Sequence, residues 1–332
     1  FAVKDTLHPD RIVLGIDPTP LGQAPFTLAT NEAVIVQAVQ LDLALPNARC
    51  WVGPCIAGHV GADTAAAILA EGPHRSETMQ LLVDIGTNAE IVLGDRTRQF
   101  AASSPTGPAF EGAQISSGQR ATAGAIEGVR IDPATLEPRI KVIGADVWSD
   151  DPTFDEATKG LDISGICGSG IIDVVAEMYL ASVIDRDGVI RGELATRSPR
   201  IVEDGRTFSY VLWGDGAGRI AVTQNDIRAI QLAKAALRAG IDLLVEHAGN
   251  PPIGEVRLAG AFGAHIDPLH AMVLGLVPDC PLSSVRAVGN SAGTGAVQAL
   301  LSRALRAEME QAVRDVMKIE TATEPRFQEL FV

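Results

Sequence analysis

One stretch of the chain, residues 81–93, limits the possible folds more than any other. It reads Leu-Leu-Val-Asp-Ile-Gly-Thr-Asn-Ala-Glu-Ile-Val-Leu, which predicts two apolar strands joined by a tight turn. Asp84 stands near the end of the first strand, and the turn consists of Gly86, Thr87 and Asn88. Such a turn can surround a phosphate with backbone N–H groups while the neighbouring carboxylate holds a hydrated magnesium ion. An ordinary hairpin with an exposed aspartate has the same pattern, so the rest of the chain must decide.

Composition and charge exclude several classes of function. The chain has 332 residues, of which 46% are hydrophobic and 20% charged, which is typical of a globular protein large enough for two lobes. Its formal net charge is -14 and it has no long basic run, which argues against nucleic acid or an anionic membrane as a partner. No signal peptide and no apolar run of about 18 residues is present, so we expect a cytoplasmic protein.

The four cysteines do not form a recognisable metal-binding pattern. They are Cys50, Cys55, Cys167 and Cys280, and no two of them are spaced as a CxxC pair. We therefore expect free thiols and no iron–sulfur or zinc site within this chain. The chain begins with Phe1 rather than Met, so we also expect a piece of a longer protein.

Hydrophobic periodicity predicts alternating helices and strands. Strands are expected at 33–39 and 49–53, although residues 33–45 also fit a helix; a helix is expected at 60–71 and a β-meander at 125–143. Thr223 and Asp226 form a predicted capping box that opens a long amphipathic helix. A charged helix is expected over 293–318, and the apolar tail at 327–332 is expected to pack on the body.

Two histidines lie near the end of a predicted strand at 255–259. Asp267 and Pro268 are expected to cap the helix that follows this strand. His265 and His270 have no obvious carboxylate partner by sequence spacing, so we expect surface or capping residues rather than catalytic groups.

A strand that ends in a loop of small residues and then opens a helix recurs along the chain. The loops are at 84–88, 104–112, 164–170, 259–267 and 288–295. Helix starts favour anions because their first N–H groups lack partners. For residues 104–112, however, a plain capped helix is the favoured interpretation, and residues 164–170 fit either an anion-binding helix start or close helix packing. For residues 164–170 we favour packing. Loops that converge on one cleft would form a nucleotide site.

Seven ordered motifs carry a resemblance to a known family. They occupy residues 14–26, 56–64, 84–91, 107–112, 166–170, 258–263 and 289–295. In this order and spacing they resemble the reductive activators of corrinoid proteins, which are ferredoxin-linked ATPases, and the resemblance covers nearly the whole chain.

The resemblance implies an α/β fold of the acetate and sugar kinase, heat-shock chaperone and actin superfamily. Such proteins have two actin-like (ribonuclease H-like) lobes, each with a mixed sheet flanked by helices, that close on ATP. Residues 1–75 would be the C-terminal part of the first ATPase lobe. Residues 76–332 would be the second lobe, with the adenosine motif and a C-terminal helix. The first phosphate hairpin and a two-iron ferredoxin domain would lie upstream of this chain.

The same resemblance implies an ATP site. Asp84 would hold Mg²⁺ through water, and 260–263 would be the adenosine motif. The residues implied to bind ATP are Gly86, Thr87, Asn88, Gly107, Pro108, Glu111, Gly112, Gly168, Ser169, Gly170, Gly260, Ala261, Phe262, Gly263, Asn290, Gly293 and Thr294. The stretch 101–104 lacks the cysteine with which related dehydratase activators hold a cluster between subunits, so a bridging cluster is not expected.

The implied function is ATP-dependent reduction of a corrinoid protein from Co(II) to Co(I), the state that accepts methyl groups. This chain would bind ATP and dock the corrinoid protein, and a homodimer is compatible with that function. No residue stands out as a general base, so we expect at most a slow ATPase coupled to electron transfer. Two alternatives remain open: a metabolite kinase of the same fold, and a non-enzymatic module whose interactions are gated by nucleotide.

Overall fold

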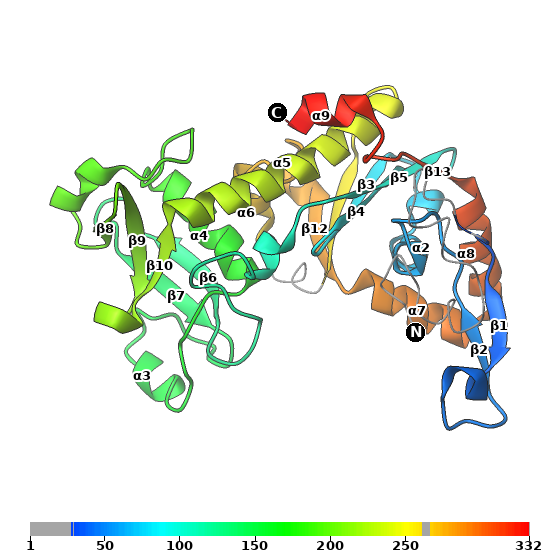
Figure 1. Cartoon of the computed structure of the whole chain (residues 1–332), viewed down its shortest axis with the longest axis horizontal. Coiled ribbons are helices and arrows are strands. Elements are labelled where there is room, and N and C mark those ends of the chain that lie inside the picture. The colour runs from blue at the N-terminus through cyan, green and yellow to red at the C-terminus, as the bar shows by residue number, and fades with distance from the viewer. Residues whose placement is uncertain (1–27, 29, 261–265, 332) are drawn as a thin grey trace.

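A six-stranded mixed sheet forms the centre of the computed structural model, which describes residues 28, 30–260 and 266–331 (Figure 1). The strand order is β12-β11-β3-β4-β5-β13. The strands are β3 (Gln80–Ile85), β4 (Ala89–Gly94), β5 (Gln99–Ser104), β11 (Glu255–Ala259), β12 (Val285–Gly289) and β13 (Val316–Lys318). Strands β3, β4 and β5 form an antiparallel meander. Strand β11 pairs in parallel with β3 and β12, and β13 pairs in parallel with β5.

Helices cover both faces of this sheet, which explains why β3 is a continuous apolar run rather than an alternating one. On one face Leu82 packs with Ile68 of α2 (Ala62–Glu71) and with Ala312 of α8 (Arg303–Asp315). On the other face lies α5 (Gln224–His247), where a Cβ on Gly240 would come within 2.7 Å of Ile91. A third helix, α7 (Ser291–Leu301), packs against α2.

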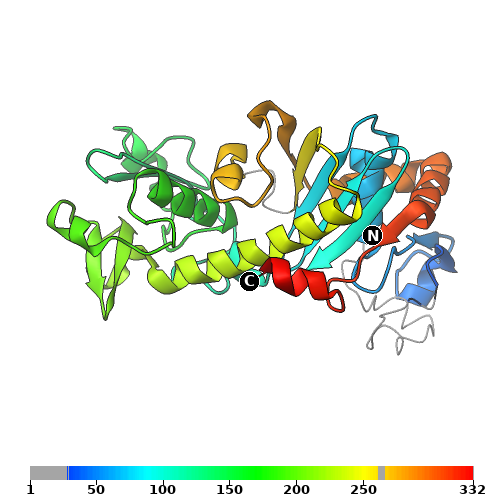
Figure 2. The same cartoon turned by 90° about the horizontal axis from the view of Figure 1, so that it is seen from above.

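A large insertion, residues 105–223, separates β5 from α5. Its strands are β6 (Ile126–Ile131), β7 (Pro138–Val142), β8 (Ile201–Asp204), β9 (Thr207–Trp213) and β10 (Ile220–Thr223), and its helices are α3 (Phe154–Ala157) and α4 (Gly168–Leu180). β6 and β7 form a hairpin, and β8 to β10 form a separate three-stranded sheet. The insertion lies at the opposite end of the molecule from α7 and α8, and α5 runs between the two ends (Figure 2).

The predicted capping box at the start of α5 is confirmed. The Thr223 hydroxyl accepts a hydrogen bond from the N–H of Asp226 at 3.2 Å, and the Asp226 carboxylate accepts one from the N–H of Thr223 at 2.8 Å. Asp267 is likewise the N-cap of α6 (Pro268–Val273), accepting from the N–H of Leu269 at 2.9 Å. Local cap signals therefore place both helix starts correctly.

Several other predicted elements are confirmed. β1 (Val34–Gln37) and β2 (Arg49–Val52) form an antiparallel hairpin, so the ambiguous range 33–45 holds a strand followed by the 3-10 helix Ala38–Leu41. The meander expected at 125–143 contains two strands only, β6 and β7, which form a hairpin. The tail forms α9 (Pro325–Phe331), in which Phe327 is buried against the core, whereas Val332 lies outside the described residues. Short 3-10 helices occur at Ala38–Leu41, Pro73–Arg75, Pro108–Glu111, Gly192–Thr196, Gly216–Gly218 and Leu282–Ser284.

Two expectations are wrong. The single helix expected over 293–318 is interrupted at Ser302, whose ψ of 122° is extended and whose hydroxyl accepts from the N–H of Leu305 to cap α8. The last residues of that range are strand β13. The loop after β5 does not open an α-helix, because the 3-10 helix Pro108–Glu111 ends at Gly112, which has a φ of 85°. Among the described residues, no helix combines the length and apolarity that a membrane span requires.

Candidate functional site

Three parallel strands end side by side at one edge of the central sheet. Ala259 of β11 is paired with Asp84 of β3 on one side and with Gly289 of β12 on the other. Loops at the carboxyl ends of parallel strands are where open α/β sheets bind their ligands. The structure therefore brings together the start of three predicted loops, those at 84–88, 259–267 and 288–295.

The predicted turn after β3 is present and is held from one side by the loop that follows β5. The N–H of Gly86 donates to the carbonyl oxygen of Asn88 at 3.1 Å. The Thr106 hydroxyl lies 3.1 Å from the carbonyl oxygens of both Gly86 and Thr87. Sequence reasoning missed this role of Thr106, because a threonine in a loop gives no sign of the backbone groups it will contact.

Gly260 brings the loop after β11 into contact with Asp84. Its φ is 115°, and its N–H donates to the carbonyl oxygen of Gly289 at 3.0 Å. A Cβ at this position would lie 2.5 Å from the carbonyl oxygen of Ile85 and 3.1 Å from the Asp84 carboxylate. Only glycine permits both the backbone conformation and this close approach.

Glu111 places a second carboxylate at the same turn. The Thr87 hydroxyl donates to its Oε1 at 3.0 Å, and this oxygen would lie 3.6 Å from a Cβ on Gly86. The neighbouring Phe110 is fully buried and anchors the short 3-10 helix that carries Glu111. At the two ends of this helix, Gly107 and Gly112 have φ values of 71° and 85°, which favour glycine. Pro108 is its first residue.

The residues predicted after β12 build the start of α7. Asn290 is the N-cap, and its side-chain oxygen accepts from the N–H of Gly293 at 2.7 Å. The Thr294 hydroxyl donates to the Asn290 carbonyl oxygen at 3.2 Å. A Cβ on Gly295 would come within 1.9 Å of the carbonyl oxygen of Ala66, so this glycine lets α7 pack closely on α2. This helix start lies close to Gly260, because Gly289, the residue before Asn290, accepts the hydrogen bond from the N–H of Gly260.

The glycine cluster that opens α4 makes packing contacts. The Ser169 hydroxyl donates to the carbonyl oxygen of Glu127 at 3.0 Å, and a Cβ on Gly170 would lie 2.3 Å from the carbonyl oxygen of Ile126. Gly168 is buried beside them. These contacts dock α4 on β6, and α4 also packs beside the 3-10 helix that carries Glu111. ATP binding by these three residues stays a prediction.

Part of the predicted adenosine motif cannot be placed. Ala261, Phe262 and Gly263 lie outside the described residues, as does His265. Residues 14–26, which carry the first motif of the resemblance, also lie outside them.

The expectation that His270 lacks a carboxylate partner is wrong. Its Nδ1 lies 2.6 Å from Oδ1 of Asp173, and its Nε2 lies 2.9 Å from Oε1 of Glu177. The side chain is only 1% exposed. Both partners come from α4, far away in sequence, so spacing around His270 could not show them. A signal was present in α4 itself, where two acidic residues four apart interrupt an apolar helix.

The site fits a nucleotide with a hydrated divalent cation. Asp84 and Glu111 supply oxygen ligands of the kind Mg²⁺ prefers, and this ion often takes only one or two carboxylates together with water and phosphate oxygens. No group of three or more His, Cys, Asp or Glu suited to a metal occurs in the described part of the chain. All four cysteines are free, as expected.

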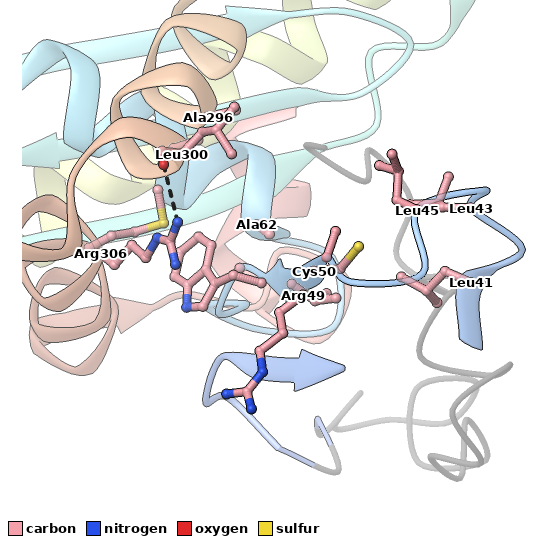
Figure 3. A pocket seen from close by; sticks show the side chains of 15 residues that line it. Leu41, Leu43, Leu45, Arg49, Cys50, Ala62, Ala296, Leu300 and Arg306 are labelled. Atoms are coloured by element: carbon pink, nitrogen blue, oxygen red, sulfur yellow. Dashed lines mark hydrogen bonds between the residues drawn. The ribbon is translucent and has the colours of Figure 1, made fainter. Parts of the chain in front are cut away.

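A pocket of about 450 Å³ lies elsewhere, between the β1–β2 hairpin and helices α2, α7 and α8 (Figure 3). Its lining is largely apolar and includes Leu43, Trp51, Leu300 and Met309. In Figure 3 Arg306 reaches back to its neighbouring helix, where its guanidinium donates to the carbonyl oxygen of Leu300 at 3.2 Å. None of the residues predicted to bind ATP lines this pocket.

Comparison with known proteins gives consistent matches along the chain. Residues 78–332 match a family model described as the C-terminal domain of RACo, the ASKHA domain, and residues 9–76 match one described as the RACo middle region. A "Corrinoid activation enzyme RamQ" of Eubacterium limosum is 35% identical over 97% of this chain and 53% of its own length. A "[Co(II) methylated amine-specific corrinoid protein] reductase" of Methanosarcina barkeri is 30% identical over 70% of this chain and 41% of its own length.

A solved structure has the same fold. The "Reductive activator for corrinoid,iron-sulfur protein" superimposes with a TM-score of 0.85 at 33% identity, covering 98% of this chain and 50% of the other. The chain thus spans about half the length of the relatives it matches. The ASKHA domain is the actin-like nucleotide-binding fold that the motifs predicted. The chain belongs to the RACo family, of which it carries the middle region and the C-terminal ASKHA domain.

Proposed function

We propose that the protein containing this chain uses Mg·ATP to drive the reduction of a corrinoid protein from Co(II) to Co(I), and that this chain binds the nucleotide and docks the corrinoid protein. One observation carries the proposal: Asp84, Gly260 and Gly289 meet at the carboxyl ends of three parallel strands. The names of the relatives support the corrinoid protein as partner, since both describe activation or reduction of such a protein.

Each group at the site has a proposed role. The N–H groups of the 86–88 turn bind phosphate oxygens, and Asp84 holds Mg²⁺ through water. Glu111, hydrogen-bonded to Thr87, orients a water molecule on the same side of the turn. Gly260 lets the adenine lie against backbone. Bound Mg·ATP supplies the binding free energy that favours one conformation of the protein over another.

The electron path lies outside the groups described here. We assign the two-iron ferredoxin cluster to a part of the protein beyond this chain, which spans half of its relatives. We also propose that the two lobes divide between residues 75 and 76. The two family matches support this division, since one ends at residue 76 and the other begins at residue 78. The four free thiols suit the reducing cytoplasm, which we propose as the location.

The decisive experiment measures the oxidation state of the corrinoid cobalt. The full natural protein, a chemical reductant of low potential and a Co(II) corrinoid protein are mixed with and without Mg·ATP, and formation of Co(I) is recorded by its absorbance. We expect Co(I) to form only with Mg·ATP, and Asp84→Asn to prevent Co(I) formation even when Mg·ATP is present. Asp95→Asn, in the turn at the other end of β4, is the matched control and should behave as wild type.

Three outcomes would contradict the proposal. Reduction that proceeds equally well without ATP would remove the role of the nucleotide. Phosphoryl transfer to a small acid or sugar would show a metabolite kinase instead. Tight ATP binding without any electron transfer in the full protein would show a nucleotide-gated interaction module.

A further inference from the structure

A second group of charged side chains, some buried and some half-buried, lies between α4, α6 and β6. We call Arg130, Asp173, Glu177, Asp267 and His270 the His270 cluster. The guanidinium of Arg130 donates to the carboxylates of Asp173 at 2.9 Å and Asp267 at 2.8 Å. It also lies 3.7 Å from Glu177. His270 completes the cluster through the two contacts described above, and its side chain is almost inaccessible to water.

The geometry favours a charged imidazole. Both ring nitrogens of His270 face carboxylate oxygens, at 2.6 Å and 2.9 Å. A neutral ring would donate from one nitrogen only and would point the lone pair of the other at a carboxylate. Burial lowers the pKa of His270, but the hydrogen bond and negative charge of Asp173 outweigh burial, so that the pKa is raised. Arg130 opposes this rise and Asp267 adds to it.

The carboxylates are also tied to the backbone of β6. Asp173 accepts from the N–H of Val129 at 3.3 Å, and Glu177 accepts from the N–H of Ile131 at 3.0 Å. Two cations thus face three carboxylates whose remaining oxygens are hydrogen-bonded. Such a satisfied buried network holds its elements in one arrangement.

Helix α6 connects this cluster to the nucleotide site. One carboxylate oxygen of Asp267 caps α6 and the other accepts from Arg130 at 2.8 Å. Helix α6 also contacts β12. Gly289 at the end of β12 accepts a hydrogen bond from the N–H of Gly260, and Gly260 lies against Asp84.

We propose that His270 is a positioning residue for nucleotide binding: the His270 cluster locks α6 onto the insertion and thereby holds β12 and Gly260 in place at the nucleotide site. This inference rests on the proposed nucleotide site and adds to it a residue that touches no nucleotide. By thermodynamic linkage, a nucleotide that favours the locked arrangement must also be sensed at His270.

The first test is His270→Gln in the full natural protein, with Mg·ADP affinity measured by calorimetry. Glutamine is neutral and cannot replace both N–H donors, so we expect the dissociation constant to rise by about tenfold. The far-UV circular dichroism spectrum should remain that of a folded protein. His247→Gln at the end of α5 is the matched control, because this histidine is 38% exposed and should leave affinity unchanged.

The second test needs no variant. The ring nitrogens of His270 are observed by ¹⁵N–¹H correlation in the wild-type protein at pH 7.5, with and without Mg·ADP. We expect both nitrogens to carry a proton and their shifts to change on nucleotide addition.

The outcomes separate this inference from the proposed function. If wild type binds no adenine nucleotide, the proposed function fails and the positioning role fails with it. If wild type binds Mg·ADP and His270→Gln binds it equally well, only the positioning role is overturned. A neutral His270 ring in the wild type would also overturn it, as would ring shifts indifferent to nucleotide.

Discussion

Two sets of carboxylates, at the Asp84 turn and in the His270 cluster, differ in what surrounds them. At the turn, Glu111 lies exposed and accepts a hydrogen bond from the Thr87 hydroxyl, and its carboxylate would lie 3.6 Å from a Cβ on Gly86. In the cluster, Asp173 and Glu177 are buried and face an imidazole and a guanidinium. The first arrangement is suited to receiving a cation and a phosphate. The second already contains its cations and is suited to holding helices together.

The largest effect is predicted for a substitution in the His270 cluster. Asp173→Asn removes the carboxylate that His270 and Arg130 share, which leaves the buried imidazole and the half-buried guanidinium poorly balanced. Loss of one partner from a buried pair costs about 3–5 kcal/mol of unfolding free energy. Chemical denaturation followed by circular dichroism measures this cost.

The control for that experiment is Asp242→Asn. Asp242 pairs with Arg238 four residues earlier on a partly exposed face of α5, at 2.8 Å. Such pairs contribute about 0.3–0.5 kcal/mol. If both substitutions cost the same, burial of the cluster has no energetic consequence and the contrast between the two sets of carboxylates is wrong.

The sequence could predict the turn at Asp84 but not the contacts within the His270 cluster, for a physical reason. The turn at Asp84 and the capping box at Thr223 are made by residues close in sequence, so local pattern sufficed. Neither the partners of His270 nor the contacts of Thr106 are local; they follow from how α4, α6 and the β5 loop pack. The break at Ser302 was missed because the helical pattern continues across it.

The next largest effect concerns nucleotide affinity at the Asp84 turn and is tested at Gly260. Gly260→Ala would meet both a disfavoured φ of 115° and the Ile85 carbonyl oxygen 2.5 Å away. Because Asp84 lies against the same position, we expect the affinity for Mg·ADP to fall about 100-fold, or about 2.7 kcal/mol. Calorimetry with the full natural protein measures it.

Gly249→Ala is the matched control. Gly249 has a φ of 80° but no atom that would contact the added Cβ within 4 Å. It therefore carries the backbone strain without the clash, about 1 kcal/mol of stability, and should leave nucleotide affinity unchanged. Equal affinity in both variants would show that close approach at Gly260 has no part in binding.

A smaller effect appears as pH dependence of stability. The pKa of His270 is raised in the folded protein above its unfolded value of about 6.5. The stabilisation is therefore fully present below about pH 6.5 and is lost as pH rises through the folded pKa. Each pH unit that separates the folded from the unfolded pKa contributes about 1.4 kcal/mol to it. Denaturation series from pH 6 to 9 should show this decline in wild type but not in His270→Gln. Parallel curves for the two proteins would exclude a charged His270.

The smallest effect returns to the turn and asks what Glu111 does there. Its carboxylate is exposed and hydrogen-bonded to Thr87, so Glu111→Gln keeps the shape and the hydrogen bond while removing the charge. We expect Mg·ADP affinity to change by less than about threefold, since an exposed charge contributes under about 1 kcal/mol. ATP hydrolysis should slow by about tenfold, because a neutral amide no longer withdraws a proton from the attacking water. Gln114→Glu, in the same loop, tests whether added charge alone matters. If Glu111→Gln hydrolyses ATP at the wild-type rate, Glu111 shapes the turn and takes no part in the reaction. Asp84 is then the one carboxylate of the turn with a role in ATP chemistry.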